Sequence, residues 1–294
     1  MGESSITGER VIACLAERFP QLYIAPAEGE DTLQLHRLAA GRGAAPADAN
    51  LSHFVTSERD ELRVVDTPAG PVEVVFLAQR QDFETFLQII GHKSQPVPIA
   101  RTVGAITYRG LADWAAVARA HEQNVAQGGD DWPAEFTRLA KQPGAFRAEL
   151  IVISEGPYSN IAASQTPYGE EEWLGISREI RLHHECAHVV CRRTMPDDIL
   201  PVWDEITADV TGLLCATGHY DADLAARFLG VTSDGFDGGR LSEYLNEEQL
   251  SRINEVATEV FAALTQIAQM VGAQEADAPF EFLLHLKRHP LLTY

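Results

Sequence analysis

Residues 182–193 read LHHECAHVVCRR, and they close a longer segment, from residue 171, that has no proline and only one glycine. The segment opens on acidic residues and ends on two arginines, charges that suit the two ends of a helix. An α-helix advances about 100° per residue, so His184 and His188 project from one face, about one turn apart. The sequence therefore predicts a long helix that presents two imidazoles side by side.

Two histidines in this arrangement can bind one metal ion, and Glu185 stands beside them on the flank of the same face. There Glu185 can take a proton from a water molecule without being a ligand itself. The chain has ten histidines, so a chance HExxH pattern somewhere in it has a probability on the order of a few per cent. The pattern is therefore suggestive alone, and its support must come from the segment that follows.

A second helix is predicted over residues 201–214, ending near Gly218, since glycine suits the end of a helix. Its apolar residues recur at helical spacing, and Glu205 and Asp209 border that apolar stripe four residues apart. The short connection at residues 196–200 makes the two helices neighbours, so Glu205 can approach the histidine pair. A catalytic zinc ion usually takes three protein ligands and keeps one position open, and these residues supply such a set.

The HExxH helix followed by a helix with the pattern E-x-x-x-D resembles the active site of the gluzincin group of zinc metallopeptidases, which includes the thermolysin-like enzymes and the minigluzincins. The resemblance covers about residues 171–217. It implies that His184, His188 and Glu205 hold a Zn²⁺ ion and that Asp209 accepts a hydrogen bond from His184. An acceptor of this kind fixes the ring of a histidine ligand.

Other metal sets remain open from the residues alone. His183 precedes the motif, but it is five residues from His188 and about 140° away around the helix. Cys191 shares a stripe with His184 and His188, although three ligands on one helix approach an ion from one side only. Glu205 and Asp209 are also compatible with solvated acids on a helix of an acidic protein.

Four residues near the motif are candidate hydrogen-bond donors to a developing oxyanion: Tyr158, Tyr168, His219 and Tyr220. The first two lie in the loop before the metal helix, and the other two follow the second helix. Residues 148–154 form a strong strand pattern. By resemblance to gluzincins it is the edge strand that pairs with an extended substrate, and an interior strand is equally compatible with the pattern.

The expected fold is α+β and zincin-like, with a small mixed or antiparallel sheet in residues 1–198 and a helical part in residues 199–294 that carries the third ligand. Apolar and polar residues alternate on both sides of a turn at residues 67–70, and this pattern predicts a hairpin. A further strand is expected at residues 102–108, and residues 25–50 are expected to be irregular. Helices are expected at residues 9–19, 82–92, 111–125, 221–229, 247–272 and 276–287.

Composition limits the partners and the compartment. The formal charge of −20 argues against binding to a nucleic-acid backbone. No apolar run is long enough to span a bilayer, and the first residues carry no export signal, so a cytoplasmic protein without membrane contact is expected. The four cysteines have no C-x-x-C spacing, which favours free thiols.

These patterns predict a zinc-dependent hydrolase, most simply a peptidase acting on a peptide or protein substrate, with Glu185 as general base. The alternative is a non-catalytic metal sensor or partner-binding protein that derives from a zincin. The presence of Glu185 favours the enzyme, because metal binding alone has no use for a general base. The sequence carries no signal for the oligomeric state.

Overall fold

The computed structural model describes residues 5–142, 144–195 and 200–292. It combines helices with a small mixed sheet, and the chain divides into two compact units. The first unit comprises Met1–Val65, Val72–Ala100 and Ile106–Ser154, and the second comprises Asp66–Pro71, Arg101–Ala105 and Glu155–Tyr294.

The predicted boundary between residues 198 and 199 does not coincide with this division. Helices α6 (Glu170–Thr194) and α7 (Pro201–Thr217), which it would separate, both belong to the second unit and pack along each other. Both helices match the predicted ones, and α7 ends at Gly218 in the left-handed conformation. The connection predicted at residues 196–200 lies almost wholly outside the described residues.

The first unit contains a five-stranded sheet in the order β1-β2-β3-β5-β4. The strands are β1 (Ile6–Thr7), β2 (Glu61–Val65), β3 (Val72–Leu77), β4 (Ala105–Ala112) and β5 (Arg147–Ser154). Strands β2 and β3 form the predicted hairpin, with Val65 opposite Val72, whereas β3 and β5 run parallel. The sheet is therefore mixed, as expected.

The interpretation of residues 148–154 as an edge strand is wrong, because β5 lies between β3 and β4. Four consecutive residues of β5, Leu150–Ile153, are buried. A continuous apolar run of this kind belongs to a strand that is covered on both faces. Strand β5 uses its backbone groups within the sheet and is not available to pair with an added peptide strand.

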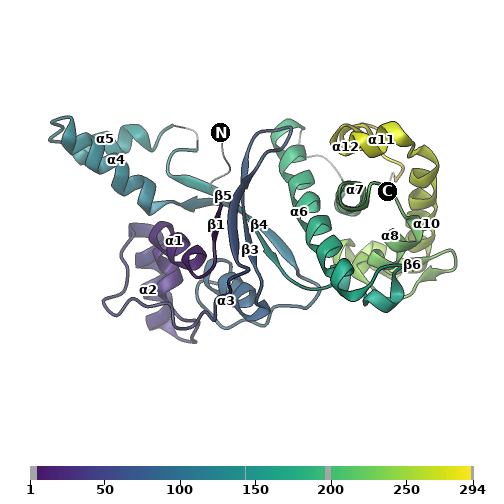
Figure 1. Cartoon of the computed structure of the whole chain (residues 1–294), viewed down its shortest axis with the longest axis horizontal. Coiled ribbons are helices and arrows are strands. Elements are labelled where there is room, and N and C mark those ends of the chain that lie inside the picture. The colour runs from purple at the N-terminus through teal and green to yellow at the C-terminus, as the bar shows by residue number, and fades with distance from the viewer. Residues whose placement is uncertain (1–4, 143, 196–199, 293–294) are drawn as a thin grey trace. The chain divides into compact units, whose positions relative to one another are not determined.

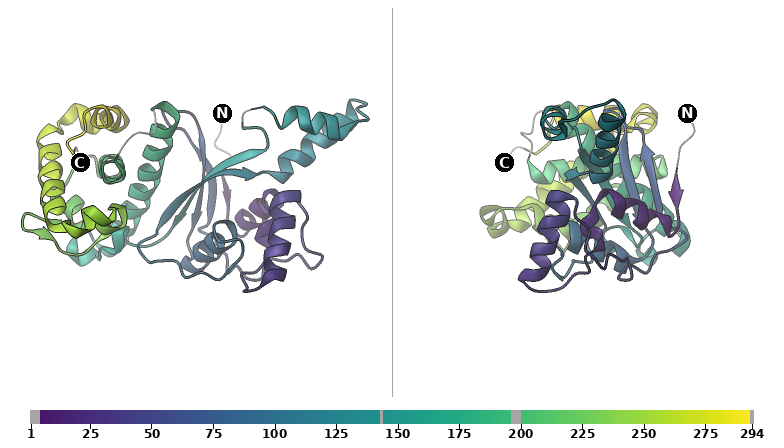
Figure 2. Two further views of the ribbon diagram at one scale, coloured as in Figure 1. Left: turned by 180° about the vertical axis from the view of Figure 1, so that it is seen from behind. Right: turned by 90° about the vertical axis from the view of Figure 1, so that its left-hand side faces the viewer.

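Five helices accompany the sheet in the first unit: α1 (Arg10–Arg18), α2 (Glu30–Arg42), α3 (Arg80–Ile90), α4 (Trp114–Ala126) and α5 (Trp132–Leu139). Helices α1 and α3 match the predicted ones. The prediction of irregular structure at residues 25–50 is wrong, because it contains α2, whose acidic first turn and left-handed Gly43 are ordinary helix ends. Helices α4 and α5 form an extended pair without a buried residue (Figures 1 and 2).

Strand β4 continues to Ala112, where a helix had been predicted to start at residue 111. The helix begins after Asp113, whose carboxylate accepts a hydrogen bond from the backbone N–H of Ala116. Arg18 pairs with that same carboxylate and with Glu73. The start of α4 is thus set by a cap that a residue distant in the sequence holds in place.

Helix α7 forms the centre of the second unit. Figure 1 shows it end-on, with α6 on one side and α8 (Ala222–Leu229), α10 (Ile253–Met270), α11 (Ala273–Asp277) and α12 (Pro279–Arg288) around it. Every α7 residue from Ile206 to Leu214 is buried, as expected of a helix enclosed on all sides. At Gly212 a Cβ atom would lie 2.8 Å from the carbonyl oxygen of Ile180, so glycine permits the close approach of α6 and α7.

The C-terminal part of the second unit is mostly helical, as predicted. The long helix expected at residues 247–272 is interrupted at Arg252, which separates α9 (Glu247–Ser251) from α10. A two-stranded hairpin, β6 (Val231–Thr232) with β7 (Gly235–Phe236), and the short helix η4 (Arg240–Tyr244) were not predicted. Among the described residues, every helix is too short or too polar to cross a membrane.

Candidate metal centre

The predicted ligands His184 and His188 on α6 and Glu205 on α7 lie together. The Nε2 atoms of the two histidines are 3.1 Å apart. The Glu205 carboxylate places Oε2 3.4 Å from Nε2 of His184 and Oε1 3.5 Å from Nε2 of His188. In the described part of the chain this is the one group of three or more such side chains that is close enough to hold a metal ion.

The spacing of these donor atoms can be compared with that around a tetrahedral zinc ion. Ligand atoms about 2.0–2.2 Å from a tetrahedral zinc ion are separated from one another by roughly 3.3–3.6 Å. The two histidine nitrogens are 3.1 Å apart, close to that interval, and each has a different Glu205 oxygen within it, at 3.4 Å from His184 and at 3.5 Å from His188. Two imidazoles and one carboxylate are also a common donor set for catalytic zinc, with one position left for water or substrate.

Residues of three other elements support His184 on the Nδ1 side of its ring. Its Nδ1 atom is 2.8 Å from Oδ1 of Asp209, the acceptor that the resemblance implied. The Tyr158 hydroxyl donates to the same oxygen at 2.5 Å. Arg240, from η4, donates to the other oxygen of Asp209 at 2.5 Å and stacks over the Tyr158 ring. The carboxylate is thus fixed on both oxygens.

The charges around His184 favour its protonated form in the metal-free protein. Burial alone would lower the pKa of His184, but its hydrogen bonds to Asp209 and Glu205 outweigh burial and raise the pKa to about 10. Burial alone would raise the pKa of Asp209, yet the charge of Arg240 and the hydrogen bond with His184 keep it below its usual value. A metal ion must therefore displace a proton from His184.

His188 has a separate support. Its Nδ1 atom is 2.9 Å from Oδ2 of Asp204, the residue directly before Glu205. The other Asp204 oxygen pairs with the ammonium group of Lys287 on α12. Burial by itself raises the pKa of Asp204, but the hydrogen bond from His188 and the charge of Lys287 outweigh it and hold the pKa well below its usual value.

The Glu205 carboxylate has the phenol of Tyr244, at the end of η4, in its neighbourhood. Burial and the nearby carboxylates raise the pKa of this phenol, so it stays a hydrogen-bond donor. Burial alone would raise the pKa of Glu205, but hydrogen bonding and charge from His184 lower it. Glu205 is therefore a carboxylate at neutral pH, as a metal ligand must be.

Glu185 is partly exposed on α6, directly after His184, and does not belong to the three-residue group. Tyr158 lies on the Nδ1 side of His184, opposite the Nε2 atom that faces the group, so its hydroxyl supports Asp209. Tyr168 is stacked on Trp173. The hydrogen bonds of Tyr158 and the ring contact of Tyr168 thus involve neither His188 nor Glu205.

The two other candidate donors follow α7. The side chain of His219 is exposed, and its Nδ1 is 3.0 Å from the carbonyl oxygen of Thr217. The hydroxyl of Tyr220 is buried and has no hydrogen-bond partner among the described residues. The structure thus brings neither of them into hydrogen-bond contact with the three-residue group.

The alternative ligands lie apart from the group. The Nε2 atom of His183 is 3.7 Å from a carboxylate oxygen of Glu179. Cys191 packs with Ala187 and Leu283, and burial raises the pKa of its thiol to about 11, which disfavours the thiolate that a metal would need. All four cysteines are free thiols, as predicted.

Sequence reasoning missed four residues of the centre: Asp204, Arg240, Tyr244 and Lys287. Asp204 adjoins Glu205 in the sequence, and an acid one residue before a ligand on the same helix was a usable signal. The other three come from segments 35 or more residues further along, and no local pattern distinguishes them. They could be found only after the helices of the second unit were placed.

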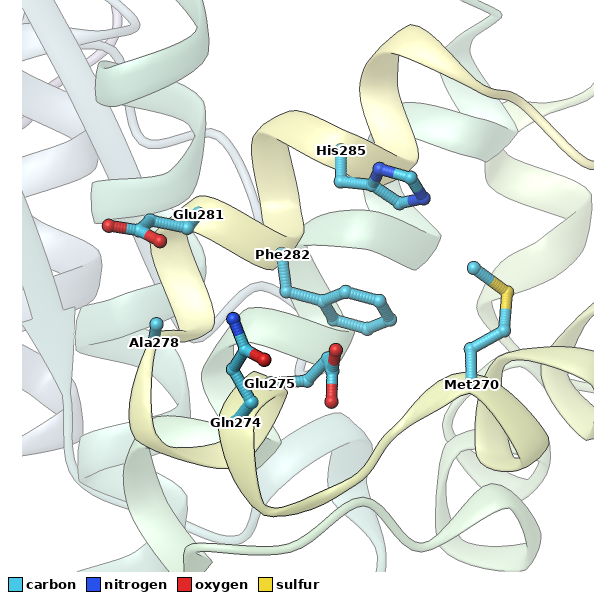
Figure 3. Close-up of a pocket in the computed structure, with 7 residues that line it drawn as sticks. All are labelled: Met270, Gln274, Glu275, Ala278, Glu281, Phe282 and His285. Atoms are coloured by element: carbon cyan, nitrogen blue, oxygen red, sulfur yellow. The ribbon is translucent and has the colours of Figure 1, made fainter.

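A separate hollow of about 240 Å³ opens on α10, α11 and α12 (Figure 3). The Phe282 ring, Met270 and His285 face it, together with Glu275. None of its lining residues is among the ligands or their supports. Its open, mixed lining defines no particular ligand.

Comparison with known proteins places the chain by sequence. No curated protein and no solved structure matches it. The model of a family of unknown function, DUF7005, matches residues 4–281, and the chain therefore belongs to that family.

Proposed function

We propose that this protein is a zinc-dependent hydrolase with a zincin-like second unit, acting as a metallopeptidase on a peptide or protein substrate. The observation that carries the proposal is the convergence of His184 Nε2, His188 Nε2 and the Glu205 carboxylate within 3.1–3.5 Å of one another. Side chains of the same types on a solvated surface would have no reason to be supported by a buried carboxylate and cation.

In this proposal His184, His188 and Glu205 hold the ion. When bound, zinc supplies a Lewis acid that polarises a carbonyl group and acidifies water. Asp209 keeps the Nδ1 proton of His184 in place, so that the lone pair on Nε2 faces the ion. Asp204 does the same for His188.

Glu185 is the general base. It follows a ligand on the same helix, is partly exposed to solvent and stands outside the ligand group. A carboxylate there takes the proton of the attacking water and passes it to the nitrogen of the departing amine. In a purely structural zinc site, a carboxylate beside the ligands would have no role, however well the two histidines are held.

The test compares Glu185→Gln with the wild type. We expect the variant to bind zinc as the wild type does and to lose turnover by about 10²–10⁴-fold, because it keeps the shape of the side chain but not the base. Metal content is measured after dialysis, and cleavage of a peptide library is followed by mass spectrometry. Glu179→Gln, on the same helix, is the matched control and should keep both properties.

Two results would contradict the proposal. Full turnover by Glu185→Gln would remove the assigned base, and a wild-type protein without stoichiometric zinc would remove the metal site. His188→Ala should lose the ion, which ties metal content to this group. A zinc-loaded wild type that cleaves no member of the library would favour a metal-dependent sensor.

A further inference from the structure

Lys287 is a buried cation of the second unit that has no role in the proposed chemistry. Its side chain is 1% exposed, and it pairs with Asp204. Burying an ammonium group away from water is strongly unfavourable unless the group is paired with an opposite charge. A buried lysine is therefore tolerated only where the charge of its partner compensates the loss of hydration.

Helix α12 delivers this lysine to α7. Leu283 of α12 packs with Ala187 of α6 and Ala208 of α7. The indole N–H of Trp203, the residue before Asp204, donates to the carbonyl oxygen of Leu286 at 3.1 Å. Lys287 follows directly, so its position relative to Asp204 is fixed on both sides by packing and by a hydrogen bond.

Asp204 connects this cation to a ligand. One of its oxygens pairs with Lys287, and the other is 2.9 Å from Nδ1 of His188. The carboxylate is 34% exposed, so without the lysine it is free to turn toward water. Its acceptor oxygen would then leave Nδ1, and the imidazole would lose the contact that fixes its orientation and its tautomer.

We propose that Lys287 is a positioning residue that acts through Asp204 to hold His188 as a metal ligand, so that the metal centre depends on α12. The inference rests on the proposed function. It adds a dependence of the ion on the C-terminal helix, about 80 residues after the ligands. The expected size is that of other residues that orient a ligand, about 10–100-fold in metal affinity.

The experiment measures Co²⁺ and Zn²⁺ affinity by competition with a chelator, in full-length protein whose folding is checked by circular dichroism. We expect Lys287→Met and Asp204→Asn each to weaken binding by about 10-fold or more. The double variant should be no weaker than the weaker single one, because both changes break one chain of contacts. Lys287→Arg should stay within about threefold of wild type, since it keeps the charge.

Arg288→Met is the matched control: the residue is adjacent on α12, carries the same charge and is exposed. It should bind both ions as the wild type does. If Lys287→Met does not fold, Lys287→Gln replaces it, because the amide keeps polar atoms near Asp204 without the charge. The visible spectrum of bound Co²⁺ reports the ligand geometry, so it should change in Asp204→Asn and in the Lys287 variants without the charge, and not in Lys287→Arg or Arg288→Met.

The inference is overturned if Lys287→Met, or Lys287→Gln in its place, binds the ions as tightly as the wild type. It is also overturned if removing Lys287 weakens binding equally in the Asp204→Asn background, because the lysine would then act by another route. A wild type that binds no metal would overturn the proposed function and this inference with it. Metal binding without peptide cleavage would leave the inference supported by the affinity data and would contradict only the enzymatic function.

Discussion

The two histidines of the centre are supported in the same way but in different surroundings. Each donates to a carboxylate of α7, and each carboxylate pairs with a cation from further along the chain. On the His184 side the carboxylate of Asp209 is 3% exposed and also accepts from Tyr158. On the His188 side the carboxylate of Asp204 is 34% exposed, and apart from His188 its partner is the Lys287 cation.

This difference separates a rigid support from an adjustable one. Water cannot replace Arg240 or Tyr158 around Asp209, so every contact there is needed to compensate a buried charge. Water can reach Asp204, so if the carboxylate loses its cation, hydration partly replaces the lost interaction. The contacts around His184 therefore contribute mainly to the stability of the second unit. The contacts around His188 contribute mainly to the metal affinity of the site.

The largest expected effect comes from Arg240→Met. Removing the cation leaves Asp209 as a buried carboxylate with fewer partners, which should cost about 3–5 kcal/mol in free energy of unfolding. Chemical denaturation of the metal-free protein measures it. Lys287→Met is the comparison, and we expect a clearly smaller loss because Asp204 becomes hydrated. Equal losses for the two variants would show that burial does not separate the two sides.

Next in size is the effect of each carboxylate on the ion. Asp209→Asn and Asp204→Asn both replace an acceptor that fixes a ligand, so each should weaken zinc binding by about 10–100-fold. We expect Asp209→Asn near the upper end and Asp204→Asn near the lower end, because a water molecule can serve His188 but not His184. Chelator competition gives both affinities. The reverse order would contradict the distinction between the two sides.

The smallest expected effect is the response to pH. The folded pKa of His184, about 10, exceeds the ordinary value of 6.5. Protonated His184 therefore stabilises the metal-free protein fully below about pH 6.5, and this contribution disappears as the pH rises through about 10. Zinc must displace that proton, so its apparent affinity should rise by up to about tenfold between pH 7 and pH 8.

Thermal unfolding with and without zinc checks this pH dependence. The metal-free midpoint should fall and the zinc-induced increase should grow over the same pH interval. His184→Gln, which cannot carry the proton, should show a metal-free midpoint with a weaker dependence. A zinc-induced increase that does not change with pH would contradict the assigned protonation of His184.

Much of the centre could be predicted from local patterns. The helical spacing of His184 and His188 and that of Glu205 and Asp209 follow from sequence periodicity, and the structure places all four together. The hairpin of β2 and β3 was predictable for the same reason. Helix α2 was missed although its end signals are present, because its interior has only a weak apolar stripe.

Other features depend on contacts between distant segments. The apolar run of β5 predicts a strand that is covered on both faces, but such a strand can lie at the edge or in the interior of a sheet, and only the order of the sheet distinguishes them. Arg240 and Tyr244 belong to a short helix with no regular pattern, and their importance comes from what α7 presents to them. Of the candidate oxyanion donors, Tyr158 proved to support Asp209.

The sequence by itself determined the donor atoms: two imidazoles one turn apart, and a carboxylate on the next helix with a second acid four residues later. This was possible because helical periodicity is a local property of the chain. Only the tertiary structure decided how each donor is held, since the two carboxylates meet their cations through packing of α7 against η4 and α12. Burial, which makes one support rigid and the other adjustable, is a property of the packed unit and not of any segment.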